Sequence, residues 1–346
     1  MSNDYFRRVT QLTPTKMWIN NITSEEARMA IDAGALGCTQ NPSYTWKMLT
    51  HENESAYARD LLEKILKETN DDNEAICILQ RKLIKRVADE FMPLWEKSNG
   101  EHGYVSIQGD PIHEEDPSVI IHEARINREM SPNMMIKIPA TKAGIEAMDV
   151  LISENTPINA TEVMGLSQAM DICLMYDRIA KQTGKKPKIY YSLITGIYDE
   201  YLQDWADKQN IDISPDILFQ AGMAIAKKTY QMTKAQWPEI GYIGGGVRGL
   251  HHFTEMVGAD VCITMNWQGQ VEELLKLDQK VVSRFFNPVP ELFIDGLLSK
   301  VSEFRRAYMI NGLTLDEYET FGPVEYFRDM FVSAWEKSVD MAKSLR

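Results

Sequence analysis

The sequence predicts an α/β fold, a (β/α)₈ barrel with additional helices. Eight short apolar segments alternate with longer amphipathic ones, which is typical of βαβ units around a parallel sheet. The first strand-to-helix turn, 20–23, contains no glycine, whereas doubly wound open sheets usually have five or six strands and a glycine-rich first turn. We therefore expect one domain over 1–346, with the barrel at about 16–275 and C-terminal helices at about 291–346, packed on the outside of the barrel.

The expected strands are short runs of apolar and β-branched residues bounded by turn signals. They cover 16–20, 36–40, 103–108, 134–138, 158–162, 188–192, 240–244 and 260–265. Three of the helices between them have readable starts: Thr23 with Glu26 forms a capping-box pattern, Asp116 precedes a proline, and Thr141 precedes the third. The connections 54–97 and 195–237 exceed a minimal crossover, so each should hold two or more helices.

The composition excludes several classes of protein. Lys and Arg total 37 against 50 Asp and Glu, a formal charge of −13, which is the wrong sign for a nucleic-acid-binding surface. No apolar run is long enough to cross a bilayer and no secretory signal begins the chain, so we expect a cytoplasmic protein without a membrane partner. The four widely spaced cysteines predict reduced, mostly buried thiols.

We expect no metal and no organic cofactor. His251 and His252 are adjacent, and the sequence spacing supplies no third ligand, so we expect both to lie on the surface.

The lysine on the fourth expected strand is the main candidate for chemistry. Strand alternation places Met135 and Lys137 on one face and Met134, Ile136 and Ile138 on the other. Helices cover the outer face of a barrel strand, so the apolar face should point outward. Lys137 is then expected inside the barrel, near the strand's C-terminal end, where the active sites of such barrels lie.

A lysine among apolar layers should have a pKa below its usual value, because burial disfavours the charged form. A neutral amine can attack a ketone and form a Schiff base, which withdraws electrons from the adjacent carbon and lets a carbon–carbon bond break or form. The alternative is an ordinary strand-end lysine whose ammonium reaches solvent or pairs with a carboxylate.

Three motifs together resemble the transaldolase family and the related fructose-phosphate aldolases. They are TQNPS at 39–43, IKIPAT followed by KAGIEAM around Lys137, and NATEVMGLSQA at 159–169. They fall in the family's order and on its expected strands, and the resemblance runs from about Met17 to Leu275. It implies the barrel fold, and it places the family's Schiff-base lysine on Lys137.

The resemblance also assigns the other site residues, with departures. The family's strand-one aspartate, which handles the proton of a substrate hydroxyl, matches Asn20, and an amide cannot take a proton. The asparagine that binds substrate hydroxyls matches Asn41. The transaldolase glutamate on strand three, which works through a water, matches Gln108. The fructose-phosphate aldolases also have glutamine there, together with a strand-six tyrosine that matches Ile194.

Because both carboxylates are missing, the proton must move through another group. The threonine that helps hold the family's catalytic water matches Thr161. Nearby strand ends offer five further candidates: Tyr190, Tyr191, Asp110, Glu162, and a water held by Gln108 and Thr161. Tyr191 and Glu162 have the wrong strand parity and should face outward unless a bulge re-aims them.

The family binds the substrate's phosphate with two arginines, and this chain retains one. The first position matches Ile197 and the second matches Arg248, just after the triple glycine that contains Gly245 and Gly246. Glycines after strand seven of a barrel often let backbone N–H groups approach an anion. We expect Gly245, Gly246, Arg248 and Ser192 to contact the substrate. With one arginine of two, the chain should have a weaker phosphate site, bind an anion at a different position, or bind a substrate whose end is uncharged.

The sequence thus predicts a transaldolase-like enzyme. Its partner is a small sugar or sugar phosphate, and its chemistry is aldol cleavage, addition or dihydroxyacetone transfer through Lys137; whether copies of the chain associate is left open. One alternative is a catalytically impaired or repurposed binding protein on the same fold. A second is a phosphate-handling barrel enzyme of another reaction class, centred on Arg248, with Lys137 as a counter-ion.

Overall fold

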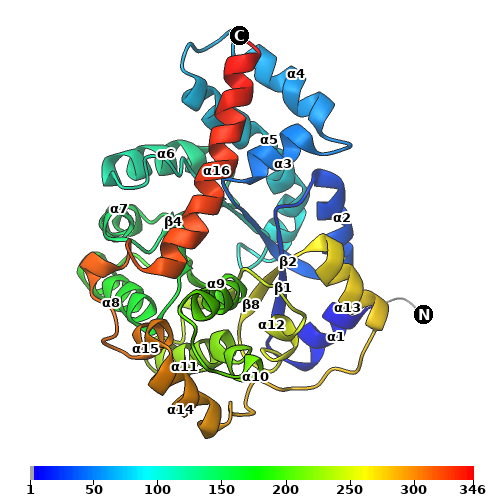
Figure 1. The fold of residues 1–346 in the computed structure, drawn as a ribbon. Helices are drawn as coiled ribbons and strands as arrows, with labels where there is room; N and C mark the ends of the chain where they lie inside the picture. Colours follow the sequence, from blue (N-terminus) through cyan, green and yellow to red (C-terminus); the bar gives the residue numbers. More distant parts are fainter. Residues whose placement is uncertain (1–3) are drawn as a thin grey trace.

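A computed structural model describes residues 4–346 and shows a closed barrel of eight parallel strands in the order β1 to β8 (Figure 1). Every strand pairs with its sequence neighbours, and β1 closes the barrel on β8. The predicted (β/α)₈ fold is confirmed. The strands are β1 (Lys16–Asn20), β2 (Ala35–Gln40), β3 (Tyr104–Gln108), β4 (Met134–Pro139), β5 (Ile158–Val163), β6 (Ile189–Leu193), β7 (Gly241–Gly244) and β8 (Cys262–Asn266).

Apolar side chains fill the N-terminal end of the barrel interior, and polar side chains follow above them. The apolar layer consists of Trp18, Tyr104, Met135, Tyr190, Ile243 and Cys262. Above it, the Ser192 hydroxyl donates to Asn159 Oδ1 at 2.6 Å. This gradient leaves the C-terminal end of the strands as the polar end of the barrel.

Strand β4 has the two faces that alternation predicts. Met134, Ile136 and Ile138 belong to the core between the barrel and its helices. Met135 packs in the interior layer, and Lys137, two residues on, points to the same side. The inward placement of Lys137 is therefore a consequence of the sequence pattern.

The helices surround the barrel, and the predicted starts are confirmed. Thr23 and Glu26 form a capping box, and the side chains of Asp116 and Thr141 accept from backbone N–H groups. The connection 54–97 contains two helices and the connection 195–237 contains three, as expected. The helices before β8 are α1 (Tyr5–Leu12), α2 (Ser24–Ala33), α3 (Tyr44–Thr50), α4 (Ser55–Ile65), α5 (Asp72–Lys97), α6 (Pro117–Glu129), α7 (Lys142–Ser153), α8 (Leu166–Thr183), α9 (Thr195–Lys208), α10 (Pro215–Leu218), α11 (Ala221–Gln236) and α12 (His251–Thr254).

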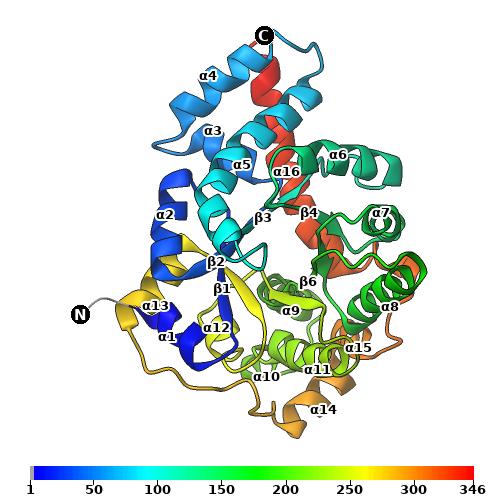
Figure 2. The ribbon, with the colours of Figure 1, turned by 180° about the vertical axis from the view of Figure 1, so that it is seen from behind.

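The segment after β8 holds η1 (Trp267–Val271), α13 (Glu272–Leu277), α14 (Glu291–Lys300), α15 (Ser302–Tyr308), η2 (Leu315–Glu317) and α16 (Gly322–Ser344). Helices α14 and α15 pack on α10, α11 and α8, outside the barrel, as expected. Helix α16 does not. It crosses the end of the barrel, in front of the strands in Figure 1 and behind them in Figure 2, and contacts α3, α5, α9 and β5.

The four cysteines are free and buried, as predicted. Within residues 4–346, no helix combines the length and apolar character that a membrane crossing requires.

Candidate active site

A cavity of about 230 Å³ opens at the C-terminal end of the strands, beneath α16. Of the predicted site residues, eight line it: Asn20, Asn41, Lys137, Thr161, Ser192, Gly245, Gly246 and Arg248. Gln108 lies behind the cavity wall instead. The side chains lining it from the described residues include two that are charged, Lys137 and Arg248, and no carboxylate.

Lys137 lies at the base of this cavity and is 5% exposed. Its Nζ donates to Asn41 Oδ1 and lies 5.4 Å from the centroid of the Phe331 ring. Burial lowers the pKa of the amine to about 8, although the negative charges of Glu162 and Glu114 act in the opposite direction. About a tenth of the amine is therefore neutral at pH 7, far more than at the usual lysine pKa.

Amide side chains fix the lysine from the β1 and β2 side. Asn41 Nδ2 donates to Asn20 Oδ1 at 3.1 Å, and the Thr39 hydroxyl donates to the same oxygen at 2.9 Å. Asn20 Nδ2 in turn donates to Asn266 Oδ1 at 2.9 Å. These bonds hold Asn41 against Lys137, and they present neutral hydrogen-bonding groups to the cavity.

Two buried carboxylates meet at Gln108, the residue paired with Lys137 in the β3–β4 register. Gln108 Nε2 donates to Glu162 Oε1 at 2.9 Å and lies 3.4 Å from Glu114 Oε2. Burial raises the pKa of both carboxyl groups, and the charge of Glu162 raises that of Glu114 further. The site thus has carboxyl groups, at positions that the family resemblance did not assign.

A bulge in β5 turns Glu162 inward. The β5–β6 register shifts between Ala160 and Val163, and Glu162 has a φ of 60°, in the left-handed region. Gln168 of α8 supports this backbone: its Nε2 donates to the Glu162 carbonyl at 3.1 Å, and its Oε1 accepts from Met164 N at 2.8 Å. The outward orientation expected from simple alternation is therefore wrong for Glu162. The cause is a bulge, which was the stated exception to that expectation.

The other candidates for proton transfer lie elsewhere. Tyr190 faces inward but belongs to the apolar layer at the far end of the barrel, against Trp18. Tyr191 faces outward and hydrogen-bonds Thr233 of α11 at 2.7 Å. The Asp110 carboxylate is in hydrogen-bonding contact with the side chains of Asn73 and His113. The Thr161 hydroxyl is buried at the cavity wall and has no protein partner among residues 4–346.

The end of the cavity away from Lys137 is largely uncharged. The Arg248 guanidinium pairs with Glu200 of α9, whose carboxylate also accepts from the Tyr326 hydroxyl at 2.6 Å. Ile194 and Ile197 line the wall beside it. The Gly245 N–H donates to the Leu193 carbonyl at 2.9 Å, so this N–H is not free to bind an anion, contrary to the expectation from the triple glycine.

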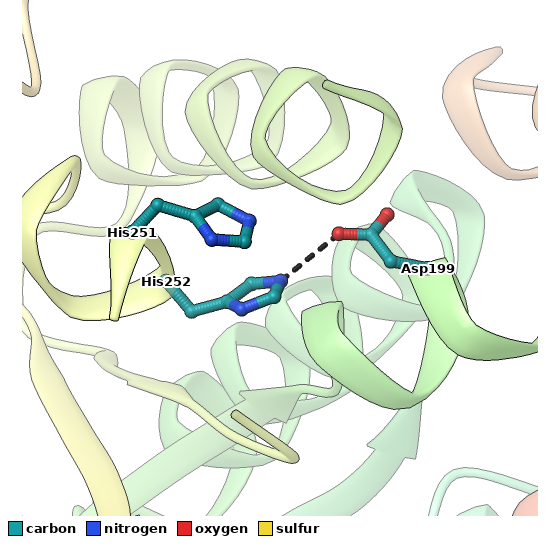
Figure 3. Close-up of side chains that lie close together, drawn as sticks. All are labelled: Asp199, His251 and His252. Atoms are coloured by element: carbon teal, nitrogen blue, oxygen red, sulfur yellow. Dashed lines mark hydrogen bonds and ion pairs between the residues drawn. The ribbon is translucent and has the colours of Figure 1, made fainter. Parts of the chain in front are cut away.

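His252 is buried, which corrects the expectation of two surface histidines. Its Nε2 contacts Asp199 Oδ2 at 2.9 Å (Figure 3). Its Nδ1 accepts from the backbone N–H of Gly249 at 3.1 Å. His251 is half-buried and stacks on His252. Asp199, from α9, provides the third group that sequence spacing could not reveal. Both ring nitrogens of His252 already have protein partners, so the cluster joins α9 to the loop after β7.

Sequence reasoning missed the contribution of α16 and of Glu114. Phe327, Met330 and Phe331 line the cavity from a helix almost 200 residues beyond Lys137 in the chain. The amphipathic pattern of that helix indicates a buried face but not its partner. Glu114 lies in the irregular segment after β3, where no periodicity fixes the direction of a side chain.

The family model described as transaldolase/fructose-6-phosphate aldolase matches residues 17–291. The chain belongs to this family. Transaldolase of Helicobacter pylori strain 26695 is 33% identical over 166 residues, 46% of this chain and 48% of that protein. Transaldolase of H. pylori strain HPAG1 is 31% identical over 195 residues, covering 54% and 57%, and that of Campylobacter jejuni strain RM1221 is 28% identical over 207 residues, covering 55% and 61%. The chain thus spans about half the length of these curated relatives.

Proposed function

We propose that this transaldolase-family chain uses Lys137 as an imine-forming nucleophile in aldol cleavage or addition, or in the transfer of a dihydroxyacetone unit between sugars. The observation that carries the proposal is the buried Lys137 amine at the base of the cavity, with its pKa lowered to about 8. A lysine kept partly neutral beside a substrate-sized space fits nucleophilic attack on a carbonyl. A strand-end lysine serving as a counter-ion would need a direct carboxylate partner, and Nζ instead contacts the Asn41 amide.

The lining of the cavity favours a polyhydroxylated ketose. Asn20, Asn41, Thr161 and Ser192 offer amide and hydroxyl groups that suit hydroxyls rather than apolar groups. At the far end, Arg248 is already paired with Glu200, and Ile197 stands at the other family arginine position. We therefore favour a ketose whose far end is uncharged, over the phosphorylated sugar that the family name suggests.

Borohydride trapping tests the proposal. The protein is incubated with fructose, fructose 6-phosphate or dihydroxyacetone, reduced, digested and analysed by mass spectrometry. We expect a mass gain that fragment spectra place on Lys137 and not on exposed Lys142, and that is absent in Lys137→Met. If no ketose is trapped and one of them still raises the melting temperature, the alternative of a binding protein on this fold replaces the proposal.

A further inference from the structure

We propose that Glu114 and Glu162, joined by Gln108, hold one proton between them and exchange it with the imine-forming centre on Lys137. The inference rests on the proposed function and extends it, since it names the proton donor and acceptor of the same site. Neither carboxylate lines the main cavity; both stand behind it, on the β3 and β5 sides of β4.

The two carboxyl groups meet at one amide nitrogen. Gln108 Nε2 is within hydrogen-bonding reach of one oxygen from each, and the second oxygens, Glu114 Oε1 and Glu162 Oε2, are buried without a partner among residues 4–346. Two buried carboxylates at one site cannot both ionise easily, so the pair retains a proton that a lone exposed carboxyl group would lose. One proton satisfies a buried oxygen and removes one negative charge.

A small cavity of about 20 Å³ lies beside Glu114, where β3 and β4 meet α6. Glu114, Gln108 and Lys137 are among its lining residues, together with apolar residues such as Ile136, whereas Glu162 is not. The volume has room for one water molecule beside the Glu114 carboxyl group. In the proposed exchange, this water relays the proton between Glu114 and the atoms bonded to Lys137 Nζ.

The charges around the pair come from three directions. Lys137 faces Glu162 from β4, Arg328 of α16 lowers the pKa of both carboxyl groups, and Glu319 raises that of Glu114. Arg328 is itself paired with Glu319 at 3.1 Å. The pair therefore lies between two cations and keeps an exchangeable proton only because burial and mutual repulsion offset their attraction.

The pair meets the proton balance of imine formation. The Lys137 nitrogen attacks the ketone carbon, the carbonyl π electrons move to oxygen, and proton transfer from nitrogen to oxygen gives a neutral carbinolamine. The pair then gives its proton to the carbinolamine hydroxyl, the carbon–oxygen bond breaks, water leaves, and the nitrogen lone pair forms the iminium. One amine, one ketone and one proton become one iminium and one water. Hydrolysis returns the proton to the pair.

The test compares Glu114→Gln, Glu162→Gln and the double variant with Glu303→Gln, a half-buried carboxylate of α15 whose pKa burial also raises. The readout is the rate of borohydride-trapped adduct on Lys137 with dihydroxyacetone, as a function of pH. We expect the double variant to lose roughly 10²- to 10⁴-fold in rate and each single variant to lose less. Glu303→Gln should leave the rate unchanged.

The pH optimum separates proton transfer from a structural role. The charge of Glu162 raises the pKa of Glu114, and both glutamates raise the pKa of Lys137, so the pH optimum of each single variant should move to lower pH. Glu162 has a strained backbone, and Glu162→Gln could fail to fold. In that case Glu114→Gln, in the loop after β3, tests the same shift of the pH optimum. If a folded variant keeps the wild-type rate of adduct formation and the wild-type pH optimum, the inference is overturned. The proposed function still stands in that case, provided that the wild-type protein forms the adduct. Absence of any wild-type adduct overturns both.

Discussion

The Lys137 nitrogen contacts a neutral side chain, and the nearby charged groups lie behind the cavity wall. Asn41 accepts its hydrogen bond, whereas Glu162 and Glu114 act through space from behind the cavity wall. An ion pair with a direct carboxylate partner would keep the amine protonated. The substitution of amides at the strand ends therefore suits a nucleophile whose proton is handled elsewhere.

The lowered pKa of Lys137 predicts an unusual titration of its reactivity. Only the neutral amine is acylated, so trace labelling with acetic anhydride should increase with pH and reach half its maximum near pH 8 at Lys137. Exposed Lys142, whose pKa the ion pair with Asp316 raises, should label only at much higher pH. Fragment spectra that distinguish the two lysines within one peptide give both curves in one sample. Coincident curves would contradict the burial argument.

The pairing of Arg248 predicts how substrate preference can be changed. Glu200→Gln removes the carboxylate that neutralises this guanidinium at the cavity wall. We expect the variant to lower KM for fructose 6-phosphate, by up to about tenfold for roughly 1.4 kcal/mol of recovered attraction, and to leave KM for fructose unchanged. Glu325→Gln, on α16 outside the cavity lining, is the matched control. Equal changes in KM for both sugars would show that Arg248 does not distinguish a charged from an uncharged substrate.

At the scale of elements, α16 completes the site. It places Phe331, 3% exposed, against the Lys137 amine, and Arg328 near the carboxyl pair. The helix thus contributes both the apolar surface that depresses the lysine pKa and a cation that offsets the buried acids. A barrel without it would leave Lys137 open to water.

Phe331→Ala should open the site from this side. Loss of the ring lets water reach Nζ, so the pKa of Lys137 should rise from about 8 toward its usual value, measured by the same labelling. Stability should fall by about 3 kcal/mol in urea unfolding, the low end for Phe→Ala because one face of the ring borders the cavity. Met330→Ala, at a side chain 41% exposed, should change both quantities much less.

The Asp199–His252 contact predicts unequal roles for the adjacent histidines. His252→Phe leaves a buried carboxylate and the Gly249 N–H without their partner, and should cost about 3–5 kcal/mol of stability. His251→Phe preserves the stacking on Phe219 and should cost under about 1 kcal/mol. Urea unfolding of the two variants measures the difference. A similar cost for both would mean that α9 and the loop after β7 are held together by packing alone.

At the scale of the molecule, the charge of −13 bears on substrate encounter. An anionic sugar approaches against this field, which salt screens over a Debye length of about 8 Å at 0.15 M. We therefore expect kcat/KM for fructose 6-phosphate to rise with added salt, while kcat/KM for fructose stays constant. A fall with salt for the phosphate would show that the local field of Lys137 and Arg248 outweighs the net charge.

The eight strands were predictable because local patterns specify them. Apolar alternation marks each strand, and residues such as Thr23 and Asp116 mark helix starts with their own side chains. The same alternation fixed the inward direction of Lys137. Most of the cavity lining followed, because the C-terminal ends of the strands of one barrel meet at one end.

By itself, then, the sequence determined the barrel, the inward lysine and the amides at Asn20 and Gln108, where the family resemblance implies carboxylates. Only the tertiary structure decided which carboxyl groups lie near Lys137. The bulge that turns Glu162 inward, the approach of Glu114, and the crossing of α16 each depend on contacts between residues far apart in the chain. The periodicity of a sequence shows which side of a segment is buried, but not which distant segment packs against that side. These features depend on such distant contacts.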